Sequence, residues 1–516
     1  MTPFLFFLLY SLFPIISAVT TPHVPDFTRR ELLTGVGAGA AALLIDPSSL
    51  RAQPAARAIV FRNTTVVNAD LVQNDVALAV VGDKIAAIGP TDQILKGHPN
   101  ADVYDGRGKA LFPGLVNCHA HLTATLQRGF NEDFGFPNSA KLPVQPGSLL
   151  QGEEATLMTV VGALEAIRTG TTTFVENAGG IDRYAAALSK TGLRWVFAES
   201  IRDSENVPGP LSPEGLAKGE TPRFSQKLRE EGMQRISNLF SAWHGKMNGR
   251  ISVFPAAALT ETSSPELLKA VRAFAEKYDL GYTIHLNQSI AEYQFMEKFH
   301  ALRPAAFLDR HGFLGPRLFA AHARYVDAGE IALLGKSRTI ISHQANMAAN
   351  RGVIPPIPEL REAGCPIALG TDNNTNDVFE VMRIALLTER IRRTDPFPGV
   401  RPQPEDILAD ATEGGSRAVN QQKTLGSLEV GKKADLFVLD TMKPYLVPAG
   451  RLVSAVIHGG HPSDIESVMV DGEFIMRSNK VLTLDEAAII READAVSKRI
   501  WNKVGPVNVP RLPRPK

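Results

Sequence analysis

The sequence predicts an α/β fold whose central part is a (β/α)8 barrel, with a β-rich segment on each side of it. Between residues 111 and 393, eight short apolar runs alternate with amphipathic helical patterns. Before and after that region, Val, Ile and Leu alternate with polar residues, as in strands with one buried face. An open, doubly wound sheet produces the same alternation of strands and helices, so this pattern alone leaves both architectures open.

The first segment, residues 1–55, is predicted to be a targeting signal outside the fold. Residues 4–16 form an apolar run followed by small residues, as in a secretory signal peptide. Arg29 and Arg30 then precede a Gly/Ala-rich stretch at residues 35–44, and this second pattern resembles a bacterial twin-arginine signal. An N-terminal membrane anchor and an upstream extension from a misassigned start codon are the alternatives. We expect an exported protein, either secreted or periplasmic.

The first β-rich unit is predicted at residues 58–110. Apolar and polar residues alternate there around turns such as residues 81–84, which indicates a small antiparallel sheet. The barrel is predicted to occupy residues 111–425. Its eight strands are expected at residues 111–117, 171–175, 194–198, 251–256, 282–285, 318–322, 339–343 and 366–370.

Two helices between these strands are well marked. In residues 153–169, apolar side chains recur on one helical stripe and Gly170 is suited to the C-terminal cap. In residues 264–278, Ser264 can act as the N-cap and Pro265 suits the first helical position. The β pattern returns over residues 426–480, and residues 481–516 are predicted to form a helix and a Pro/Arg-rich tail.

Two long connections, residues 122–150 and 202–221, each follow a predicted strand. In a barrel, such connections lie at the carboxyl ends of the strands, where binding and catalytic residues gather. We therefore expect both to border a functional site.

Composition excludes several classes of function. The 55 Lys and Arg residues nearly balance the 54 Asp and Glu residues, which gives no electrostatic basis for binding nucleic acid. Only two cysteines are present, so a disulfide framework and a four-thiolate metal site are excluded. No long apolar run occurs after residue 50, so no stable membrane span is expected once the signal is removed. The oligomeric state stays open between a monomer and a homo-oligomer.

Histidines gather at the predicted ends of strands. Five histidines lie at or next to the predicted end of a strand: His119, His121, His285, His322 and His343. Asp372 follows the eighth strand. A single histidine there is most often a hydrogen-bonded core residue, but several on one barrel face with a carboxylate indicate a metal. His119 and His121 are two residues apart on a strand, so both side chains point to the same side. Imidazole and carboxylate ligands suit Zn²⁺ or Fe²⁺ in an open, catalytic site.

Three motifs in register resemble the metal-dependent amidohydrolases. Residues 111–121, which end in His119-Ala120-His121, are similar to that family's strand-one motif, and residues 367–372 are similar to its strand-eight aspartate motif. Residues 426–436 resemble the segment where the family's chain re-enters a composite β-sandwich. The resemblance spans about residues 58–481 and implies a barrel with a sandwich formed by residues 58–110 and 426–480.

The most similar branch contains the mononuclear cytosine, guanine and adenosylhomocysteine deaminases and the triazine hydrolases. Residues 126–129, Leu-Gln-Arg-Gly, stand at the spacing of that branch's Leu-Leu-Arg-Gly. No lysine occurs in residues 250–259, which argues against a carboxylated lysine bridging two metals. We therefore expect one divalent metal ion per chain, zinc in the first place and iron as the alternative.

The resemblance also assigns roles to individual residues. It implies that the metal is bound by His119, His121, His285 and Asp372. It further implies that His322 polarises the substrate or orients the water, and that His343 lies near the substrate although Gln344-Ala345 replaces the family's Cys-Pro. Substrate contacts are expected from Arg128, Glu176 and Asn373, for which ordinary polar packing is an equally good interpretation.

One residue departs from the family pattern. Gln288 stands where this branch has a proton-shuttling glutamate, three residues after His285, and a carboxamide cannot accept and return a proton near neutral pH. Asp372 is then the expected base, with Gln288 orienting water or substrate. The branch's strand-four histidine is also missing from residues 250–259. Both absences argue against a standard nucleoside or purine deaminase.

The sequence thus predicts a metal-dependent hydrolase that cleaves a C–N bond, in an amide or a heterocyclic amine, of a small molecule. The metal would lower the pKa of a bound water from about 15.7 towards ~7. A metal-binding pseudoenzyme or an exported ligand-binding protein is the alternative, because Gln288 removes a catalytic carboxylate.

Overall fold

The computed structural model describes residues 57–134, 142–207, 209, 210, 216, 219, 221–373, 375–509, 511 and 512. The predicted targeting signal lies outside the described residues. Parts of both long connections predicted at 122–150 and 202–221 lie outside them as well.

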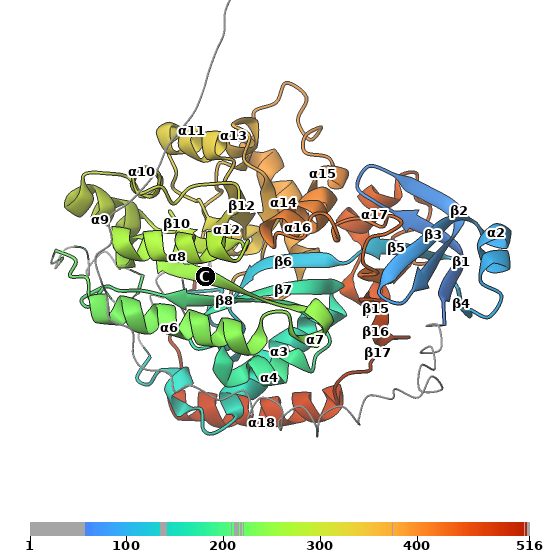
Figure 1. Cartoon of the computed structure of the whole chain (residues 1–516), viewed down its shortest axis with the longest axis horizontal. Coiled ribbons are helices and arrows are strands. Elements are labelled where there is room, and N and C mark those ends of the chain that lie inside the picture. Colours follow the sequence, from blue (N-terminus) through green and yellow to red (C-terminus); the bar gives the residue numbers. More distant parts are fainter. Residues whose placement is uncertain are drawn as a thin grey trace, which may run out of the picture. The chain divides into compact units, whose positions relative to one another are not determined.

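Eight parallel strands of the described chain form the central sheet, in sequential order (Figure 1). They are β6 (Leu115–Ala120), β7 (Thr171–Ala178), β8 (Arg194–Ile201), β9 (Ile251–Leu259), β10 (Tyr282–Leu286), β11 (Leu318–His322), β12 (Ile340–His343) and β13 (Ile367–Leu369). A bridge between Ala120 and Asp372 joins the two ends of this sheet, and the Asp372 amide donates to the His119 carbonyl at 2.9 Å. This closure confirms the barrel and excludes the open, doubly wound sheet.

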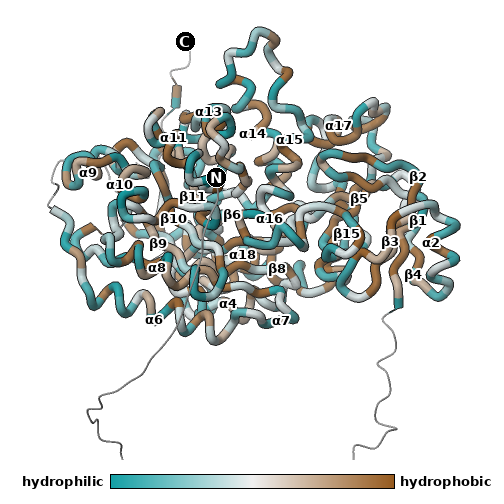
Figure 2. Tube along the Cα trace, turned by 45° about the horizontal axis from the view of Figure 1, so that its top comes forward, coloured by the Kyte–Doolittle hydropathy of each residue, from teal (hydrophilic) through white to brown (hydrophobic). Residues whose placement is uncertain are grey.

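Helices cover the outside of the barrel (Figure 1). They are α3 (Glu154–Arg168), α4 (Asp182–Ser189), α6 (Gln226–Trp243), α7 (Lys246–Gly249), α8 (Pro265–Lys277), α9 (Ile290–His300), α10 (Pro304–Arg310), α11 (Ala328–Ser337), α12 (Ala345–Asn350), α13 (Ile357–Glu362), α14 (Val378–Arg392), α15 (Pro404–Ala409) and α16 (Gly415–Ala418). The two predicted helices are α3 and α8, and Ser264 caps α8 by accepting the Leu267 amide at 3.1 Å. Figure 2 shows hydrophilic and hydrophobic stretches alternating along outer helices such as α6.

A second sheet combines both ends of the described chain. Its strands are β1 (Ile59–Val67), β2 (Val72–Val81), β3 (Lys84–Pro90), β4 (Asp102–Asp105), β5 (Lys109–Pro113), β14 (Leu436–Asp440), β15 (Ile465–Val470), β16 (Glu473–Arg477) and β17 (Lys480–Val481). β14 pairs with β5, which joins the N-terminal strands to the C-terminal ones. Helices α2 (Thr91–Gly97) and α17 (Leu452–Gly459) accompany this sheet. The composite β-domain implied by the resemblance is therefore present.

The first predicted barrel strand, residues 111–117, is two strands in the structure. β5 belongs to the second sheet, and β6 begins the barrel at Leu115. Gly114 separates them and packs against Thr172, whose side chain occupies the space that a Cβ would need. One uninterrupted apolar run hides this change of sheet, because both strands are buried.

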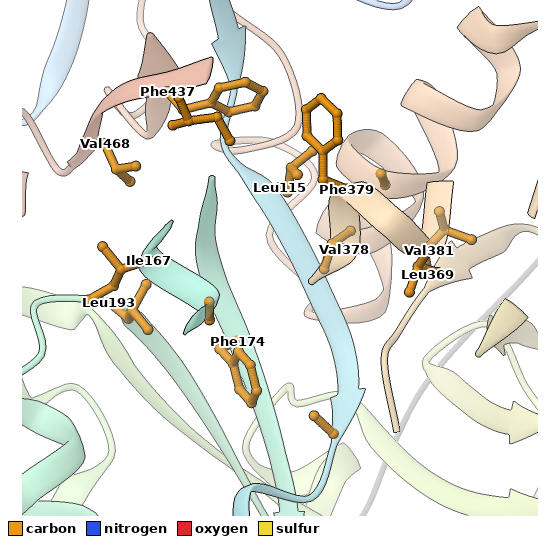
Figure 3. Packing of buried hydrophobic residues seen from close by; sticks show 14 of the residues in the cluster. Leu115, Ile167, Phe174, Leu193, Leu369, Val378, Phe379, Val381, Phe437 and Val468 are labelled. Carbon is orange, nitrogen blue, oxygen red and sulfur yellow. The ribbon is translucent and has the colours of Figure 1, made fainter. Parts of the chain in front are cut away.

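The barrel and the second sheet share a hydrophobic core. Phe437 of β14 and Val468 of β15 lie near Leu115 at the start of β6, as Figure 3 shows. Phe112 of β5 stacks on Phe437 with ring centroids 5.1 Å apart. This packing covers the amino-terminal ends of the barrel strands. The carboxyl ends are not part of this contact between the two sheets.

The last helix, α18 (Glu486–Val504), packs on α3. Asp485 caps it by accepting the Ala488 amide at 3.0 Å, and Arg499 pairs with Glu154 of α3 at 2.5 Å. The predicted C-terminal helix is confirmed. Among the described helices, none combines the length and the hydropathy that crossing a bilayer requires.

Candidate metal centre and active site

The carboxyl ends of the barrel strands bring the predicted metal ligands together. Each strand ends at the same face of a closed parallel barrel, so residues far apart in sequence become neighbours. The side chains that meet are His119 and His121 from the end of β6, His285 from β10, His322 from β11 and Asp372 after β13.

Three of these histidines form a cluster with the geometry of a metal site. One ring nitrogen from each of His119, His121 and His285 lies within 4.8 Å of the others. The Nδ1 of His121 lies 2.5 Å from the Asn177 carbonyl, and the Nδ1 of His285 lies 2.6 Å from the Ala258 carbonyl. A carbonyl oxygen only accepts, so each Nδ1 carries the proton and each Nε2 presents a lone pair.

These lone pairs need a cation. The Nε2 atoms of His121 and His285 are 3.2 Å apart, although both are acceptors in this tautomer. The Nε2 of His119 is buried and has no hydrogen-bond partner within the described structure. Burial lowers the pKa of His285 to about 4 and lowers that of His119 well below its usual value, so both rings are neutral at pH 7. Neutral imidazoles with converging lone pairs fit a divalent metal.

Asp372 lies beside the cluster. Its Oδ1 is 3.5 Å from the Nε2 of His121, and its Oδ2 is 3.8 Å from the Nδ1 of His322. Asp372 adopts a left-handed φ of 64°, its amide donates to the His119 carbonyl, and its carbonyl accepts the His121 amide. The barrel closure therefore aims this carboxylate at the histidines.

His322 is held from two sides. Its backbone amide donates to the Gln344 side chain at 3.0 Å, and its φ of 82° is left-handed. Its Nδ1 lies 3.2 Å from the guanidinium of Arg324, which only donates. The Nδ1 of His322 is therefore an acceptor, and its Nε2 carries the proton.

A cavity of about 530 Å³ opens on this cluster. Its lining includes Gln288, whose Nε2 is buried without a partner among the described residues, and Asn373. The Gln288 backbone is anchored because its amide donates to Glu292 at 2.7 Å. Gln288 and Asn373 thus present amide groups to whatever occupies the cavity.

Three of the four residues predicted to lie near the substrate are outside the described lining of this cavity: Arg128, Glu176 and His343. Arg128 pairs with Glu165 at 2.5 Å. Glu176 accepts the Leu122 amide at 2.9 Å and the Tyr184 hydroxyl at 2.8 Å, and burial raises its pKa to about 7. His343 is buried, which lowers its pKa to about 3. In this structure Glu176 holds the start of the first long connection.

Three residues of the site were not predicted from the sequence. Asn177 orients His121 through its carbonyl, and Arg183 and Arg324 line the cavity. Arg324 stands two residues after His322, and that proximity was the one available signal. A single arginine after a strand resembles an ordinary surface residue, so this signal is weak.

Comparison with known proteins agrees with this geometry. A model of the Amidohydrolase family matches residues 110–475. A 5-methylthioadenosine/S-adenosylhomocysteine deaminase from Desulforudis audaxviator is 30% identical over 434 residues, which cover 83% of this chain and 95% of that protein. A 5′-deoxyadenosine deaminase from Methanobrevibacter smithii is 31% identical over 426 residues, which cover 81% and 92%.

Solved structures show the same fold. A zinc-bound adenosine deaminase from Xanthomonas campestris has a TM-score of 0.74 at 25% identity and covers 86% of this chain and 98% of that one. A zinc-complexed atrazine chlorohydrolase from Arthrobacter aurescens TC1 has a TM-score of 0.73 at 22% identity and covers 85% and 100%.

The chain therefore belongs to the amidohydrolase family. It is a metal-dependent hydrolase that acts on C–N bonds other than peptide bonds, and its ligand cluster takes a divalent metal.

Proposed function

We propose that this protein is an exported, mononuclear zinc hydrolase that cleaves a C–N bond in a small amide or heterocyclic amine. The observation that carries the proposal is the cluster of ring nitrogens from His119, His121 and His285, which lies beside Asp372 and opens to a cavity. The deaminase names of its relatives and the zinc in two solved structures support the reaction type and the metal.

The metal would be held by His119, His121, His285 and Asp372. When bound, the cation would supply a water of lowered pKa and a Lewis acid that polarises the electron-rich atom next to the substrate's electrophilic carbon. His121 and His285 keep their Nε2 lone pairs directed inward because backbone carbonyls fix both Nδ1 protons. A set of imidazole and carboxylate ligands suits zinc better than the softer metals, which prefer thiolates.

Two residues would assist the attack of water, one by accepting a proton and one by donating a hydrogen bond. Asp372 accepts a proton from the attacking water, because it is the one carboxylate among the described lining residues. His322 donates from its Nε2, since Arg324 holds its Nδ1 as an acceptor at 3.2 Å. The Nε2–H group can donate a hydrogen bond to negative charge that develops on the substrate.

Gln288 would position rather than transfer protons. Its buried Nε2 donates no hydrogen bond to any described residue. This amide group is therefore available to orient water or substrate in the cavity. A deaminase that must protonate a ring nitrogen gains nothing from a carboxamide at this place. We therefore infer a reaction that differs from standard nucleoside deamination.

The test combines a metal measurement with a hydrolysis screen. Purified protein should contain close to one zinc per chain by elemental analysis, and should release ammonia or an amine from at least one amide, lactam, aminopyrimidine or triazine. Two metals per chain would contradict the mononuclear site.

Gln288 also motivates the second candidate, a metal-binding pseudoenzyme or ligand-binding protein. A metal-loaded protein that binds compounds from the same screen and hydrolyses none would establish it.

Export is the remaining part of the proposal. It is supported by the apolar run at residues 4–16 and by Arg29-Arg30 ahead of a Gly/Ala-rich stretch. The mature N-terminus should lie between residues 53 and 58, as read by N-terminal sequencing of natively produced protein. An intact Met1 would contradict export. Changing Arg29 and Arg30 to Lys should block export only if the twin-arginine route is used.

A further inference from the structure

The cavity carries an excess of positive charge. Its described lining contains the guanidinium groups of Arg183 and Arg324, and Asp372 is the one carboxylate there. The lining histidines are neutral where their pKa is lowered by burial, as in His285 and His322. A divalent cation at the histidine cluster adds to this excess, and Asp372 is then shared with the metal.

Arg324 is the less exposed of the two cations. Its side chain retains 4% of its full exposure, yet it forms no close ion pair with any described residue. The guanidinium lies 3.2 Å from the Nδ1 of His322, 3.5 Å from the Gln288 carbonyl and 3.7 Å from the Asp372 carboxylate. Among the described residues, the five N–H donors of Arg324 therefore make two hydrogen bonds and one loose contact with a charge. Burial lowers the pKa of Arg324, and the attraction of Asp372 does not offset that effect.

A buried charge of this kind needs a partner. Taking a guanidinium out of water is costly unless an anion of matching shape pairs with it. A planar carboxylate matches the guanidinium fork and can accept two parallel N–H bonds. Arg324 lines the cavity, so a ligand there reaches it without any change in the fold.

We propose that Arg324 binds a carboxylate of the substrate, and that this carboxylate lies next to the C–N bond that is cleaved. The inference rests on the proposed hydrolase, because it names the class of substrate for the same cavity. The position follows from the neighbours of Arg324, since the same guanidinium touches His322 and lies near Asp372. A group held by Arg324 is therefore beside His322 and Asp372.

Arg183 has a different surrounding. Its Nε and Nη2 already donate to the carbonyls of Gly180 and Gly179 at 3.1 and 3.3 Å, and the residue is exposed. It adds to the positive potential that attracts an anion into the cavity. Arg324 is the cation with unused donors inside.

Gln288 fits the same substrate class. A glutamate at position 288 would place a second negative charge among the groups that receive the carboxylate, and a carboxamide does not repel it. The loss of the family's glutamate and the presence of Arg324 thus change the charge of the cavity in the same direction.

Binding of matched compounds tests this assignment without requiring turnover. The zinc-loaded protein is titrated calorimetrically with N-benzoylglycine and its primary amide, and with 2-aminonicotinate and 2-aminonicotinamide. Each pair differs in one carboxylate, placed next to an amide or a ring amine. The carboxylate of at least one pair should bind about 10–100-fold more tightly, as a charged hydrogen bond provides.

The preference should disappear in Arg324→Met and persist in Arg491→Met. Arg491 is an exposed arginine of α18, so its replacement removes one positive charge from the protein's surface, away from the cavity. Zinc content is measured in both variants, so that loss of metal is separated from loss of the anion site.

Three outcomes would overturn the assignment. In the first, the carboxylates bind no better than the amides. In the second, the carboxylates do not bind at all. In the third, the preference for carboxylates survives in Arg324→Met, which means that they bind the metal or another group. An equal loss of turnover for both members of a pair in Arg324→Met, without a change in relative binding, would place Arg324 in transition-state stabilisation instead. Tight carboxylate binding by a protein that hydrolyses nothing in the wider screen would retain the anion site and contradict the proposed function.

Discussion

Arg194 and Arg324 are two buried arginines at opposite ends of the same barrel, and their surroundings differ sharply. Arg194, the first residue of β8, keeps 2% of its side-chain exposure and contacts Asp435 at 2.9 Å and Asp471 at 2.6 Å. These carboxylates raise its pKa above the usual value despite burial. Arg324, at 4% exposure, has its nearest carboxylate at 3.7 Å, and its pKa is lowered.

The difference separates structural charges from functional ones. Arg194 and its two aspartates link the barrel to the second sheet, and every charge there has a close partner. Arg324 is left with loose contacts because the cavity occupies the place of its partner. A well-compensated buried charge maintains the fold, and a poorly compensated one at a cavity indicates binding.

The largest expected effect is at the metal cluster. His119→Ala should remove most of the bound zinc and reduce activity at least about 10⁴-fold, since it deletes a ligand whose Nε2 has no other described partner. His244→Ala is the control, because the Nδ1 of His244 accepts the Val253 amide at 3.2 Å and is thus a partnered, structural histidine. Both variants are measured by zinc analysis and steady-state kinetics. Full zinc content in His119→Ala would contradict the ligand assignment.

The second effect tests the structural arginine. Arg194→Met should lower the free energy of unfolding by about 3–5 kcal/mol, because it leaves the buried Asp435 without its cation. Urea unfolding of wild type and variant measures this. Arg491→Met should change the free energy by less than about 0.5 kcal/mol. A destabilisation of Arg194→Met as small as that would show that the network does not hold the two sheets together.

A third effect concerns Glu176 and pH. Burial raises its pKa to about 7, so the folded protein favours the protonated carboxyl. The resulting stability is fully present below the unfolded pKa of 4.5 and is lost as pH rises through about 7. Relative to Glu176→Gln, which keeps a neutral side chain at every pH, the wild type should lose about 2–3 kcal/mol between pH 5 and 8. Parallel stability curves for the two proteins would mean that Glu176 does not titrate in this range.

A smaller effect is expected at Gln288. Gln288→Ala should lower turnover about 10–100-fold, or about 1–3 kcal/mol, because it removes one orienting hydrogen bond. Asp372→Asn should be far more damaging, since it weakens the metal site and removes the base together. If Gln288→Ala is as inactive as Asp372→Asn while it keeps its zinc, then the division of roles between these two residues is wrong.

Much of the site could be predicted because metal chemistry restricts residue types and strand geometry restricts their positions. His119 and His121 share a strand end, and Asp372 follows the last strand of the barrel, so parallel packing had to bring them to one face. The Ser264 cap of α8 was equally local, because a hydroxyl before Pro265 has few other uses.

Other features depend on contacts that no local pattern contains. The boundary between β5 and β6 depends on which sheet each half joins, and Gly114 marks it only through its contact with Thr172. Glu176 turns away from the cavity towards Tyr184, and this orientation depends on strand register. Arg324 becomes a site residue only once the barrel closes and buries it beside Asp372.

The smallest expected effect is on stability, at the functional arginine. Arg324→Met should change the free energy of unfolding of the zinc-loaded protein by no more than about 1 kcal/mol, in contrast to Arg194→Met. Methionine keeps an unbranched side chain of similar length, and it removes the cost of burying a guanidinium that lacks a close carboxylate. Asp372 is not left uncompensated, because it is expected to ligate the metal. The same unfolding experiment measures both variants, and a loss of about 3 kcal/mol or more in Arg324→Met would show that the two arginines are equally structural.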